Sequence, residues 1–455
     1  MQNSPSLPRL SIGAVGVGIS TRGVLRYLGS QGVHRVTLRA PQREDAHPLP
    51  FPPEVRWRTG DGYLSDIDED ILYLSPAVRR DQAPLCHAAA RGTVLSSDAE
   101  LFFSAYRGHA FCVSGSDGKS TTVTLAARLL EHGDFSRVRT GGNIGTALSP
   151  FLTDGREEDA YAVELSSFQL MYLSPRCRRA LITNVTENHL NWHTDMREYA
   201  EAKGHIYEHA EECVLHADDP LCRTLLPRAP YAVYSMTESP RALARLHAHT
   251  ALYLSGDHIA IDGRRLLPLD DIALPGRHGI QNVLAALSLT HGCIDPAAVR
   301  DAVRSFRGLP HRMTPVATVH GVTYIDSSID SSPARTLTTL RAMKAPPILI
   351  LCGRSKNVSE RALIAALPET VKAVVCTGEL GQQLYPRLCA DKGLAEASCP
   401  VLLADTLEDA VLAAARIARR GDTVLLSPAA TSFDAYRSFE ERGRAFAHAV
   451  EALKN

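Results

Sequence analysis

The stretch Gly115-Ser116-Asp117-Gly118-Lys119-Ser120-Thr121 decides the fold class of this chain. The apolar residues 110–113 precede it, and a helical pattern follows over residues 122–130. Glycines let backbone N–H groups approach an anion closely, and a helix N-terminus adds positive potential. Lys119 would reach the outer phosphates of a nucleotide, and Ser120 would bind the magnesium ion that accompanies them. The pattern therefore predicts a strand, a phosphate-binding loop and a helix that together bind a nucleoside triphosphate.

This loop is shorter than the common GxxxxGK[ST] form, because only two residues separate Gly115 from Gly118. The flanking strand and helix make a chance glycine turn a poor alternative. The motif indicates nucleotide binding but leaves open how the phosphoryl group is used. A protein that uses ATP for regulation or transport therefore stays an alternative at this point.

Composition and charge argue against several other classes of protein. The chain has 455 residues, enough for about two to four domains with hydrophobic cores. Hydrophobic residues make up 45% and charged residues 22%, which is typical of a globular protein. The formal net charge of -1 provides no bulk attraction for nucleic acid or an anionic membrane. We therefore expect neither a nucleic-acid partner nor a membrane partner.

Three features of the sequence indicate a cytoplasmic protein. No run approaches the about 20 apolar residues that a membrane-spanning helix needs. Residues 1–10 are polar and contain proline, unlike a secretory signal peptide. The ten cysteines are scattered without a CxxC pair, as expected of thiols in a reducing compartment.

The N-terminal segment shows a loose dinucleotide-binding pattern. A short strand at residues 10–12, a glycine turn, a helix at 21–32 and a strand at 35–38 form a Rossmann-type unit. Arg39 stands where a ribose-binding carboxylate would end the second strand, which counts against NAD and suits a phosphate. A turn that only packs a helix on a sheet is an equally good interpretation. Ser75 follows a predicted strand, at the sheet edge where ligands of open α/β sheets bind.

The rest of the chain alternates apolar strands with helical patterns, which predicts mostly parallel sheets with helices on both faces. Further strands are expected at residues 71–74, 93–95, 160–163, 179–182, 213–215, 322–325, 347–352, 373–376, 401–403 and 423–426. Helices are expected at residues 196–212, 280–289 and 439–454, and a small antiparallel patch at 251–267.

These elements predict an α/β protein with three α/β domains in series. A Rossmann-like domain would occupy residues 1–106, and a central P-loop domain with a mostly parallel sheet residues 107–312. A second Rossmann-like domain would occupy residues 313–455.

Several polar side chains follow the predicted strands. Glu164 ends the strand at 160–163, where a carboxylate near a phosphate loop can bind magnesium, although a helix-start role is the more common one. His189 lies just beyond the strand at 179–182, and this position alone does not favour a functional role over a structural one. Asn143, in a glycine-rich segment, is on its own a turn asparagine.

Two further segments allow both a structural and a functional interpretation. Lys203 lies on the expected helix at 196–212 among glutamates, which favours a solvated lysine in i,i+4 ion pairs. Ser432 and Phe433 lie in a small polar segment after the strand at 423–426. Free N–H groups there would bind a carboxylate, or the serines would cap a helix.

Taken in order, these motifs resemble the ATP-dependent Mur ligases, which are relatives of folylpolyglutamate synthase. The matching blocks are residues 115–121, 142–145, 164–170, 184–189, 203 with 206–208, and 308–312. The block 426–446 resembles the branch of the family that adds D-glutamate, and the Asp-Asn-Pro-Arg motif of the branches that add diaminopimelate or lysine is absent.

The resemblance implies a nucleotide and metal site in the central domain. It implies that ATP is contacted by Gly115, Ser116, Asp117, Gly118, Lys119, Ser120, Thr121, Asn282 and Arg312. It implies that Ser120 and Glu164 bind one magnesium ion, and that His189 and a carbamylated Lys203 bind a second. The implied catalytic set is Lys119, Glu164, His189, Lys203 and Asn143.

The resemblance also implies two substrate sites. Ser20, Arg39 and Ser75 would face a UDP moiety, and Asn143 the muramoyl-alanine part. The D-glutamate site would be formed by Ser331, Lys356, Ser432, Phe433 and Phe439.

The implied reaction adds D-glutamate to UDP-N-acetylmuramoyl-L-alanine through an acyl phosphate, in peptidoglycan precursor synthesis, by a monomeric enzyme with ATP and Mg²⁺. Two alternatives stay open: another Mur-type or folylpolyglutamate-type amide ligase, and the regulatory P-loop ATPase.

Four positions depart from the family pattern. Asn188 replaces an aspartate, Gly279 replaces an asparagine, Ser327 replaces an aspartate expected near ATP, and Ile329 replaces a lysine found in many members. Asp326 and Asp330 are candidates to replace the missing carboxylate at position 327.

Overall fold

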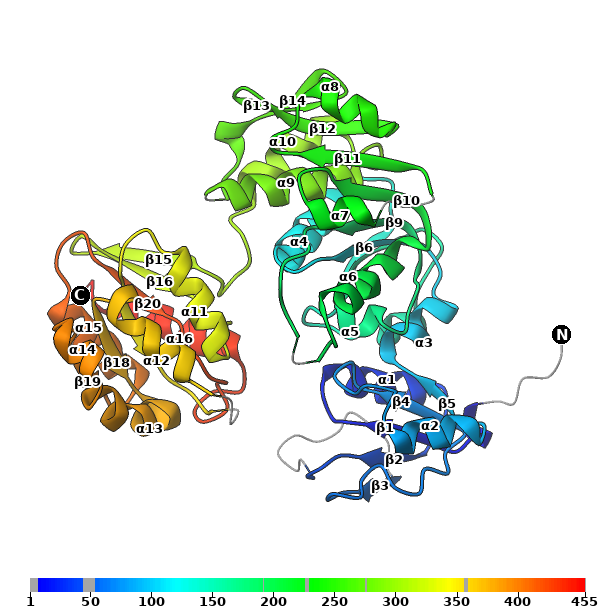
Figure 1. Cartoon of the computed structure of the whole chain (residues 1–455), viewed down its shortest axis with the longest axis horizontal. Helices are drawn as coiled ribbons and strands as arrows, with labels where there is room; N and C mark the ends of the chain where they lie inside the picture. Colours follow the sequence, from blue (N-terminus) through cyan, green and yellow to red (C-terminus); the bar gives the residue numbers. More distant parts are fainter. Residues whose placement is uncertain are drawn as a thin grey trace. The chain divides into compact units, whose positions relative to one another are not determined.

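The computed structural model describes residues 7–43, 54–190, 192–225, 229–274, 276–355 and 359–454. The chain divides into two compact units, Met1–Arg307 and Gly308–Asn455, and each is described by itself (Figure 1). Both units are built from mostly parallel sheets with helices on the two faces, which confirms the predicted α/β class. The boundaries at 106 and 312 stay a prediction.

The first unit begins with a five-stranded parallel sheet in the order β3-β2-β1-β4-β5. Its strands are β1 (Ile12–Val15), β2 (Arg35–Arg39), β3 (Glu54–Arg58), β4 (Ile71–Leu74) and β5 (Val94–Ser96). The accompanying helices are η1 (Leu7–Arg9), α1 (Ile19–Ser30), α2 (Ala83–Ala90) and α3 (Asp98–Ala105). This strand order reverses between β1 and β4, and ligands of such sheets bind where the order reverses, beyond the carboxyl ends of the strands.

Two details of this sheet correct the sequence-based expectation. Strand β1 runs through Gly13 to Val15, so the glycine turn begins only at Gly16, which has a φ of 85°. Strand β3 was not predicted, because its alternation of charged and half-buried residues at a sheet edge lacks an apolar run.

The same unit continues with a nine-stranded sheet in the order β14-β13-β12-β11-β10-β9-β6-β8-β7. Its strands are β6 (His109–Ser114), β7 (Arg137–Gly142), β8 (Asp159–Glu164), β9 (Arg176–Ile182), β10 (His209–His216), β11 (Tyr231–Ser235), β12 (Thr250–Ser255), β13 (His258–Ile261) and β14 (Arg264–Pro268). Strands β12 to β14 form the expected antiparallel patch, and the other neighbours pair in parallel.

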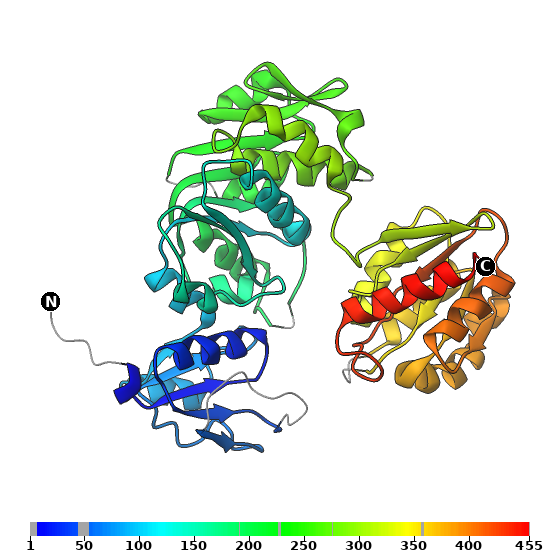
Figure 2. The same cartoon turned by 180° about the vertical axis from the view of Figure 1, so that it is seen from behind.

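Helices cover both faces of the nine-stranded sheet. They are α4 (Lys119–Leu130), η2 (Ser149–Thr153), α5 (Ser167–Leu170), α6 (Met196–Gly204), η3 (His205–Tyr207), α7 (Pro220–Thr224), α8 (Pro240–Leu243), η4 (Ala244–Leu246), η5 (Leu269–Asp271), α9 (Gly276–Thr290) and α10 (Pro296–Ser305). Alternate residues of β6 face opposite ways: Phe111 and Val113 pack with α4 and α9, whereas Ala110 and Cys112 pack on the side of α5 and α6. Figure 1 shows α5 and α6 in front of the sheet, and Figure 2 shows the face covered by α4 and α9.

The expected helix at residues 196–212 is wrong in its second half. Helix α6 ends at Gly204, and β10 begins at His209 and pairs in parallel with β9. Ala210, Cys213 and Leu215 are buried in the core cluster shared with α6, and this burial favours a strand over a continued helix. Lys203 is therefore not the solvated lysine of i,i+4 pairs, since its side chain is only 1% exposed.

The second unit contains a six-stranded sheet in the order β15-β16-β20-β17-β18-β19, with β15 antiparallel to β16 and the rest parallel. Its strands are β15 (Thr314–Val319), β16 (Val322–Asp326), β17 (Ile348–Leu351), β18 (Ala373–Cys376), β19 (Val401–Leu403) and β20 (Thr423–Leu426). Its helices are α11 (Pro333–Ala342), α12 (Arg361–Thr370), α13 (Gly378–Cys389), α14 (Lys392–Glu396), α15 (Leu407–Ile417) and α16 (Phe439–Ala452).

Five of these strands match predicted segments, and α16 matches the predicted C-terminal helix to within two residues. Core clusters on the two faces of the sheet pack against α15 and α16 on one side and against α11, α12 and α13 on the other (Figure 2). Across the described part of the chain, helices are either too short or too polar to cross a membrane.

Candidate active site

The phosphate loop joins the end of β6 to the start of α4. Gly115 and Gly118 have φ values of 137° and 78°, which residues with a Cβ rarely adopt. A Cβ on Gly115 would also collide with Thr183 Oγ1, and one on Gly118 with Asn282 Oδ1. Both glycines are therefore required by conformation and by space, and the second one brings Asn282 of α9 to the loop.

Neighbouring segments hold the loop in place. The backbone N–H of Asp117 donates to Asn184 Oδ1 at 2.9 Å, and Asn184 Nδ2 donates to the carbonyl of Asp117 at 3.1 Å. Ser116 Oγ lies 2.8 Å from the Tyr199 hydroxyl and accepts from the backbone N–H of Thr186 at 2.9 Å. The cradle is thus preorganised by residues 184–186 and by α6.

Two lysines meet at the carbonyl of Gly115. Lys119 Nζ donates to the carbonyls of Gly115 and Ser116, both at 2.8 Å, and Lys203 Nζ donates to the Gly115 carbonyl at 2.8 Å. Lys203 Nζ also lies 4.5 Å from the ring centroid of Tyr199. Burial, with repulsion by Lys119, lowers the pKa of Lys203 well below its usual value. The loop therefore combines an anion-binding backbone with a buried lysine that loses its proton more readily than an exposed lysine does.

Glu164 lies beside the loop with one carboxylate oxygen unsatisfied. It ends β8 and is aligned with Val113 of β6 in the sheet. Its Oε1 accepts from Asn143 Nδ2 at 2.8 Å, and its Oε2 is buried with no hydrogen-bond partner among the described residues. A buried carboxylate oxygen without a partner destabilises the folded state unless a cation or a hydrogen-bond donor binds to it. Its residue type, burial and place next to the loop fit a magnesium ligand.

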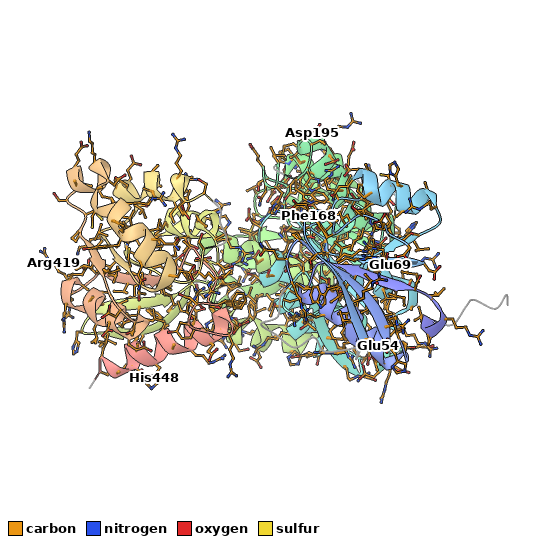
Figure 3. The ribbon with its side chains drawn as sticks, turned by 90° about the horizontal axis from the view of Figure 1, so that it is seen from below. Glu54, Glu69, Phe168, Asp195, Arg419 and His448 are labelled. Atoms are coloured by element: carbon orange, nitrogen blue, oxygen red, sulfur yellow. The ribbon has the colours of Figure 1, made fainter. Side chains whose placement is uncertain are left out.

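The other predicted residues of the nucleotide and metal site fall around the loop. Ser120 and Thr121 are half-buried in the first turn of α4. His189 is exposed, has a φ of 56°, and its ring lies 4.9 Å from the ring of Phe168 and 6.4 Å from that of Tyr199. Figure 3 labels Phe168 in this region. The sharing of one ion by His189 and Lys203 stays a prediction.

Tyr199 is a residue of this site that the sequence reasoning missed. It contacts Ser116 through its hydroxyl and Lys203 through its ring. Burial raises its pKa to about 12, so the hydroxyl stays protonated near neutral pH. In the sequence, Tyr199 lies one helical turn before Lys203, so the two side chains share a helix face. This spacing indicates a shared site only when that face of α6 is known to be buried.

The first sheet is docked to the central sheet by two arginines that were also missed. Arg79 donates to the carbonyl of Trp192 at 2.8 Å and to both carboxylate oxygens of Glu198 at 3.1 Å. The backbone N–H of Arg80 donates to the Tyr172 hydroxyl at 3.0 Å. These contacts follow Ser75 closely in the sequence, so the carboxyl edge of the first sheet faces the central sheet within this unit.

The two predicted serines of the nucleotide-sugar site lie at the switch point of the first sheet. Ser20 is half-buried in the first turn of α1, and Ser75 follows β4 directly. Gly16 brings their loops together, since a Cβ there would approach Ser75 Cβ to 3.2 Å. Ser75 also lines a small cavity together with Phe168 and Gln169 of the central sheet region.

Arg39 does not have the position expected for a UDP-binding residue. Its side chain is fully buried and grips both oxygens of Glu69, each at 3.0 Å. Its remaining N–H groups donate to the carbonyls of Tyr63, Ser65 and Asp66 at 2.8–3.1 Å. All five N–H donors of the guanidinium are thus used inside the protein. The expectation from the sequence is corrected: in this arrangement Arg39 supports the loop at 63–69.

The buried ion pair of Arg39 and Glu69 leads to a testable prediction for the stability of the fold. Replacing Glu69 with alanine removes the buried counter-ion of Arg39 and leaves only Asp68, which is 81% exposed and 3.9 Å away. We expect the free energy of unfolding to fall by about 3–5 kcal/mol. The matched control is Glu54→Ala, which removes an exposed pair with Arg35 whose side chains are 62% and 81% exposed (Figure 3). Urea unfolding of the full chain measures both, and we expect no measurable loss for the control. Equal losses would contradict the structural role of Arg39.

The predicted residues of the second unit lie on loops near its strand ends. Ser331 is half-buried, Ser432 is buried, Phe433 is 55% exposed, and Phe439 starts α16. Arg312 is exposed at the start of the unit. Lys356 lies outside the described residues. Arg354 exchanges backbone hydrogen bonds with Thr431 at 2.9 Å and 3.0 Å, so the segments leading to positions 356 and 432 are adjacent.

Arg442 organises these loops and was missed by the sequence reasoning. It is fully buried on α16 and donates to the carbonyls of Thr431, Ala430 and Ser328 at 2.9–3.0 Å. The loop after β20 is thereby tied to the loop after β16, which leads to Ser331. A buried arginine in the sequence Glu-Glu-Arg-Gly-Arg has no distinguishing local pattern.

Asp326 and Asp330, the two candidates to replace the aspartate missing at position 327, both make hydrogen bonds inside the second unit. Asp326 faces His311 Nδ1 at 2.6 Å and accepts from the backbone N–H of Ser328 at 2.8 Å. Asp330 Oδ2 accepts from the hydroxyls of Thr339 and Ser427, both at 2.8 Å. Both carboxylates therefore stabilise the second unit.

A parallel sheet, a phosphate loop and an adjoining carboxylate define the first unit as an α/β protein of the P-loop class. Two sequence models match the chain: the Mur ligase middle domain over residues 113–290, and the Mur ligase, glutamate ligase domain over residues 311–430. The chain is 32% identical over 453 residues to a protein of Clostridium novyi (strain NT) named UDP-N-acetylmuramoylalanine--D-glutamate ligase, covering 97% of this chain and 96% of that one. It is also 32% identical over 458 residues to the protein of that name from Ruminiclostridium cellulolyticum, covering 97% of each. The chain belongs to the Mur ligase family.

Solved structures agree on the fold. A UDP-N-acetylmuramate-alanine ligase from Thermotoga maritima aligns with a TM-score of 0.58 at 17% identity, covering 97% of this chain and 99% of that one. A UDP-N-acetylmuramoyl-L-alanyl-D-glutamate--2,6-diaminopimelate ligase aligns with a TM-score of 0.53 at 15% identity, covering 99% and 95%. At these identities the alignments support the shared architecture alone.

Proposed function

We propose that this protein is an ATP-dependent ligase that joins D-glutamate to UDP-N-acetylmuramoyl-L-alanine in peptidoglycan precursor synthesis. The observation that carries the proposal is the phosphate loop with Lys119, Lys203 and Glu164 gathered around it. The choice of D-glutamate rests on the relatives of that name, which match almost the whole chain. We further propose that the protein acts as a monomer in the cytoplasm.

The loop and its neighbours would hold ATP and magnesium. The loop N–H groups and the start of α4 favour the phosphates, and Lys119 would turn from the loop carbonyls to the outer phosphates. Asn282, which contacts the loop at Gly118, and Arg312 of the second unit are proposed ATP contacts. Ser120 and Glu164 would bind the ion, with Asn143 fixing the orientation of the carboxylate. Bound magnesium would stabilise negative charge on the transferring phosphoryl group.

The reaction needs no nucleophilic side chain. An oxygen of the alanyl carboxylate attacks the terminal phosphorus of ATP, which gives an acyl phosphate and ADP. The amine of D-glutamate then attacks the acyl carbon, and the tetrahedral intermediate releases phosphate and a proton to give the amide. Lys119 would stabilise the charge that develops on the phosphoryl oxygens, which is the main way proteins catalyse this kind of transfer.

Lys203 is proposed to carry a carbamate. A neutral amine attacks CO₂ and loses a proton, which replaces a cation by a carboxylate-like anion. The lowered pKa of Lys203 increases the neutral fraction of its amine at a given pH, and so favours this step. The carbamate would bind a second magnesium ion together with His189.

The substrate sites are proposed at the loop edges of the two outer sheets. Ser20 and Ser75 would contact the UDP moiety at the switch point of the first sheet, with Asn143 closer to the alanyl end. Ser331, Lys356, Ser432, Phe433 and Phe439 would form the D-glutamate site in the second unit. Closure of domains around three substrates would exclude water from the acyl phosphate.

Phosphate release tests this function directly. The full chain with ATP and Mg²⁺ is given UDP-N-acetylmuramoyl-L-alanine and D-glutamate, each alone and together. We expect sustained release only with both, and the amide product by mass spectrometry. Release that ignores both substrates would point to a regulatory ATPase. A panel with L-glutamate, L-lysine, diaminopimelate and a folate acceptor distinguishes the other amide ligases.

A further inference from the structure

A cluster of two histidines and one glutamate lies in the first unit, away from the phosphate loop. Glu212 belongs to β10, His249 directly precedes β12, and His291 directly follows α9. Helix α9 runs from the loop, where Asn282 contacts Gly118, toward Gly133 beyond the end of α4, where a Cβ would collide with the carbonyl of Cys293. Nine residues of helix rise about 13 Å, so His291 is well separated from the loop.

The three side chains converge on one point. Glu212 Oε1 lies 3.0 Å from His249 Nε2 and 3.3 Å from His291 Nε2, and all three atoms lie within 4.8 Å of one another. Ligand atoms around a tetrahedral ion with bonds of about 2.0–2.1 Å stand about 3.3 Å apart. The two distances to the carboxylate are therefore already close to those of a metal site. His249 is 43% exposed and is free to close the remaining distance.

The hydrogen bonds of His291 orient its lone pair toward the carboxylate. Its Nδ1 lies 2.7 Å from the carbonyl of Ser288, so that nitrogen carries the proton and donates it. The Nε2 of the neutral ring is then an acceptor that faces another acceptor, Glu212 Oε1. Burial, followed by the charge of Arg179, lowers the pKa of His291 and favours this neutral ring. A metal-binding histidine commonly donates its other N–H to a carbonyl in this way.

Arg179 holds the carboxylate in position. Its Nε donates to Glu212 Oε2 at 2.7 Å, and its Nη1 donates to the carbonyls of Leu289 and His291. Glu212 Oε1 is therefore the oxygen directed at the two imidazoles. Arg179 also neutralises one negative charge, so we expect weaker binding than in a closed structural zinc site with four protein ligands.

We propose that Glu212, His249 and His291 bind a divalent transition-metal ion, with zinc as the first candidate and water in the fourth position. Two imidazoles and one carboxylate suit zinc, copper or nickel, whereas magnesium prefers oxygen ligands. The ion would join β10, the segment before β12 and the segment after α9, and so stabilise this part of the sheet.

Metal titration of the untagged full chain tests the proposal. Metal-free protein is titrated calorimetrically with ZnCl₂ in excess Mg²⁺, which competes for the oxygen-rich site near the phosphate loop. The variants are His249→Gln, whose side chain is partly exposed, and His291→Gln. The matched control is His209→Gln, an exposed histidine of the same strand β10. Co²⁺ absorption and the unfolding midpoint with and without Zn²⁺ are read on the same proteins.

We expect one zinc site that is weakened at least tenfold in His249→Gln and in His291→Gln and is unchanged in His209→Gln. Zinc should raise the unfolding midpoint of the parent and of the control, and should do so less in His249→Gln. Absence of zinc binding to the parent, equal binding by His249→Gln, or equal weakening by His209→Gln would overturn the proposal. In any of these cases the contacts among Glu212, His249 and His291 serve only to hold the three segments together. Ligase activity is not used as a readout.

Discussion

Replacing Lys119 with alanine should lower kcat for ligation by about 10³-fold while leaving the fold intact. In the structure, Lys119 Nζ donates to two loop carbonyls and thus lies over the cradle where phosphates would bind. Its charge is compact and its stem flexible, so the side chain can follow charge as it develops on the phosphoryl oxygens. Alanine removes this charge at the point where transition-state stabilisation is needed.

For Lys119→Ala, phosphate release measures turnover, and urea unfolding shows whether the variant is folded. The control is Lys344→Ala, which removes an exposed lysine of the second unit and should leave turnover unchanged. Far-UV circular dichroism and the urea midpoint should show that both variants are folded. Turnover of a folded Lys119→Ala variant within a few-fold of the parent would contradict the role of the loop in phosphoryl transfer.

The short-range features of this molecule were predictable from the sequence. The phosphate loop is a local motif, and its two glycines are needed for positive φ and for close approach. Strands β4, β18, β19 and β20 match their predicted bounds because they are bounded apolar runs. Strands β4, β18 and β20 are mostly buried inside their sheets, and a strand buried on both faces requires such a run, so the sequence carries the signal locally.

Features that depend on tertiary contacts were not predictable in the same way. Lys203 has glutamates around it in sequence, yet α6 ends one residue later and the side chain is buried under the loop. Arg39 stands where a ligand-binding residue is expected, but carbonyls of a loop more than 20 residues away use its donors. The docking contact of Arg79 with Glu198 spans 119 residues. A local sequence pattern cannot predict contacts between residues so far apart in the chain.

The resemblance to the Mur ligases supplies information on Lys203 that local sequence patterns do not contain. The glutamates around Lys203 in the sequence favour a solvated side chain, whereas the family pattern treats this lysine as part of the site. The burial of Lys203 and its contact with Gly115 agree with a place at the loop. A carbamate is an anion and an ammonium that only holds the loop is a cation, so added carboxylate and labelled bicarbonate distinguish the two states.

Replacing Lys203 with alanine should lower kcat by about 10²–10³-fold, because the proposed metal ligand that helps to stabilise transition-state charge is lost. If the lysine carries a carbamate, a small carboxylate that diffuses into the space should restore part of the activity. We therefore expect formate or acetate to raise the turnover of Lys203→Ala at least tenfold. The matched control is Lys119→Ala, in which the lost group is a cation, and added carboxylate should not raise its turnover.

The parent protein provides an independent measurement of the same carbamate. Incubation with ¹³C-labelled bicarbonate should give a carbamate ¹³C resonance that is absent in Lys203→Ala. Lowering the pH protonates the Lys203 amine and disfavours the carbamate, so activity should fall in acid and recover with added CO₂. The lowered pKa of Lys203 moves this loss to lower pH than for an ordinary lysine. A loop-holding lysine would give neither the resonance nor the rescue, because its hydrogen bond to the Gly115 carbonyl requires a donor that a carboxylate cannot supply.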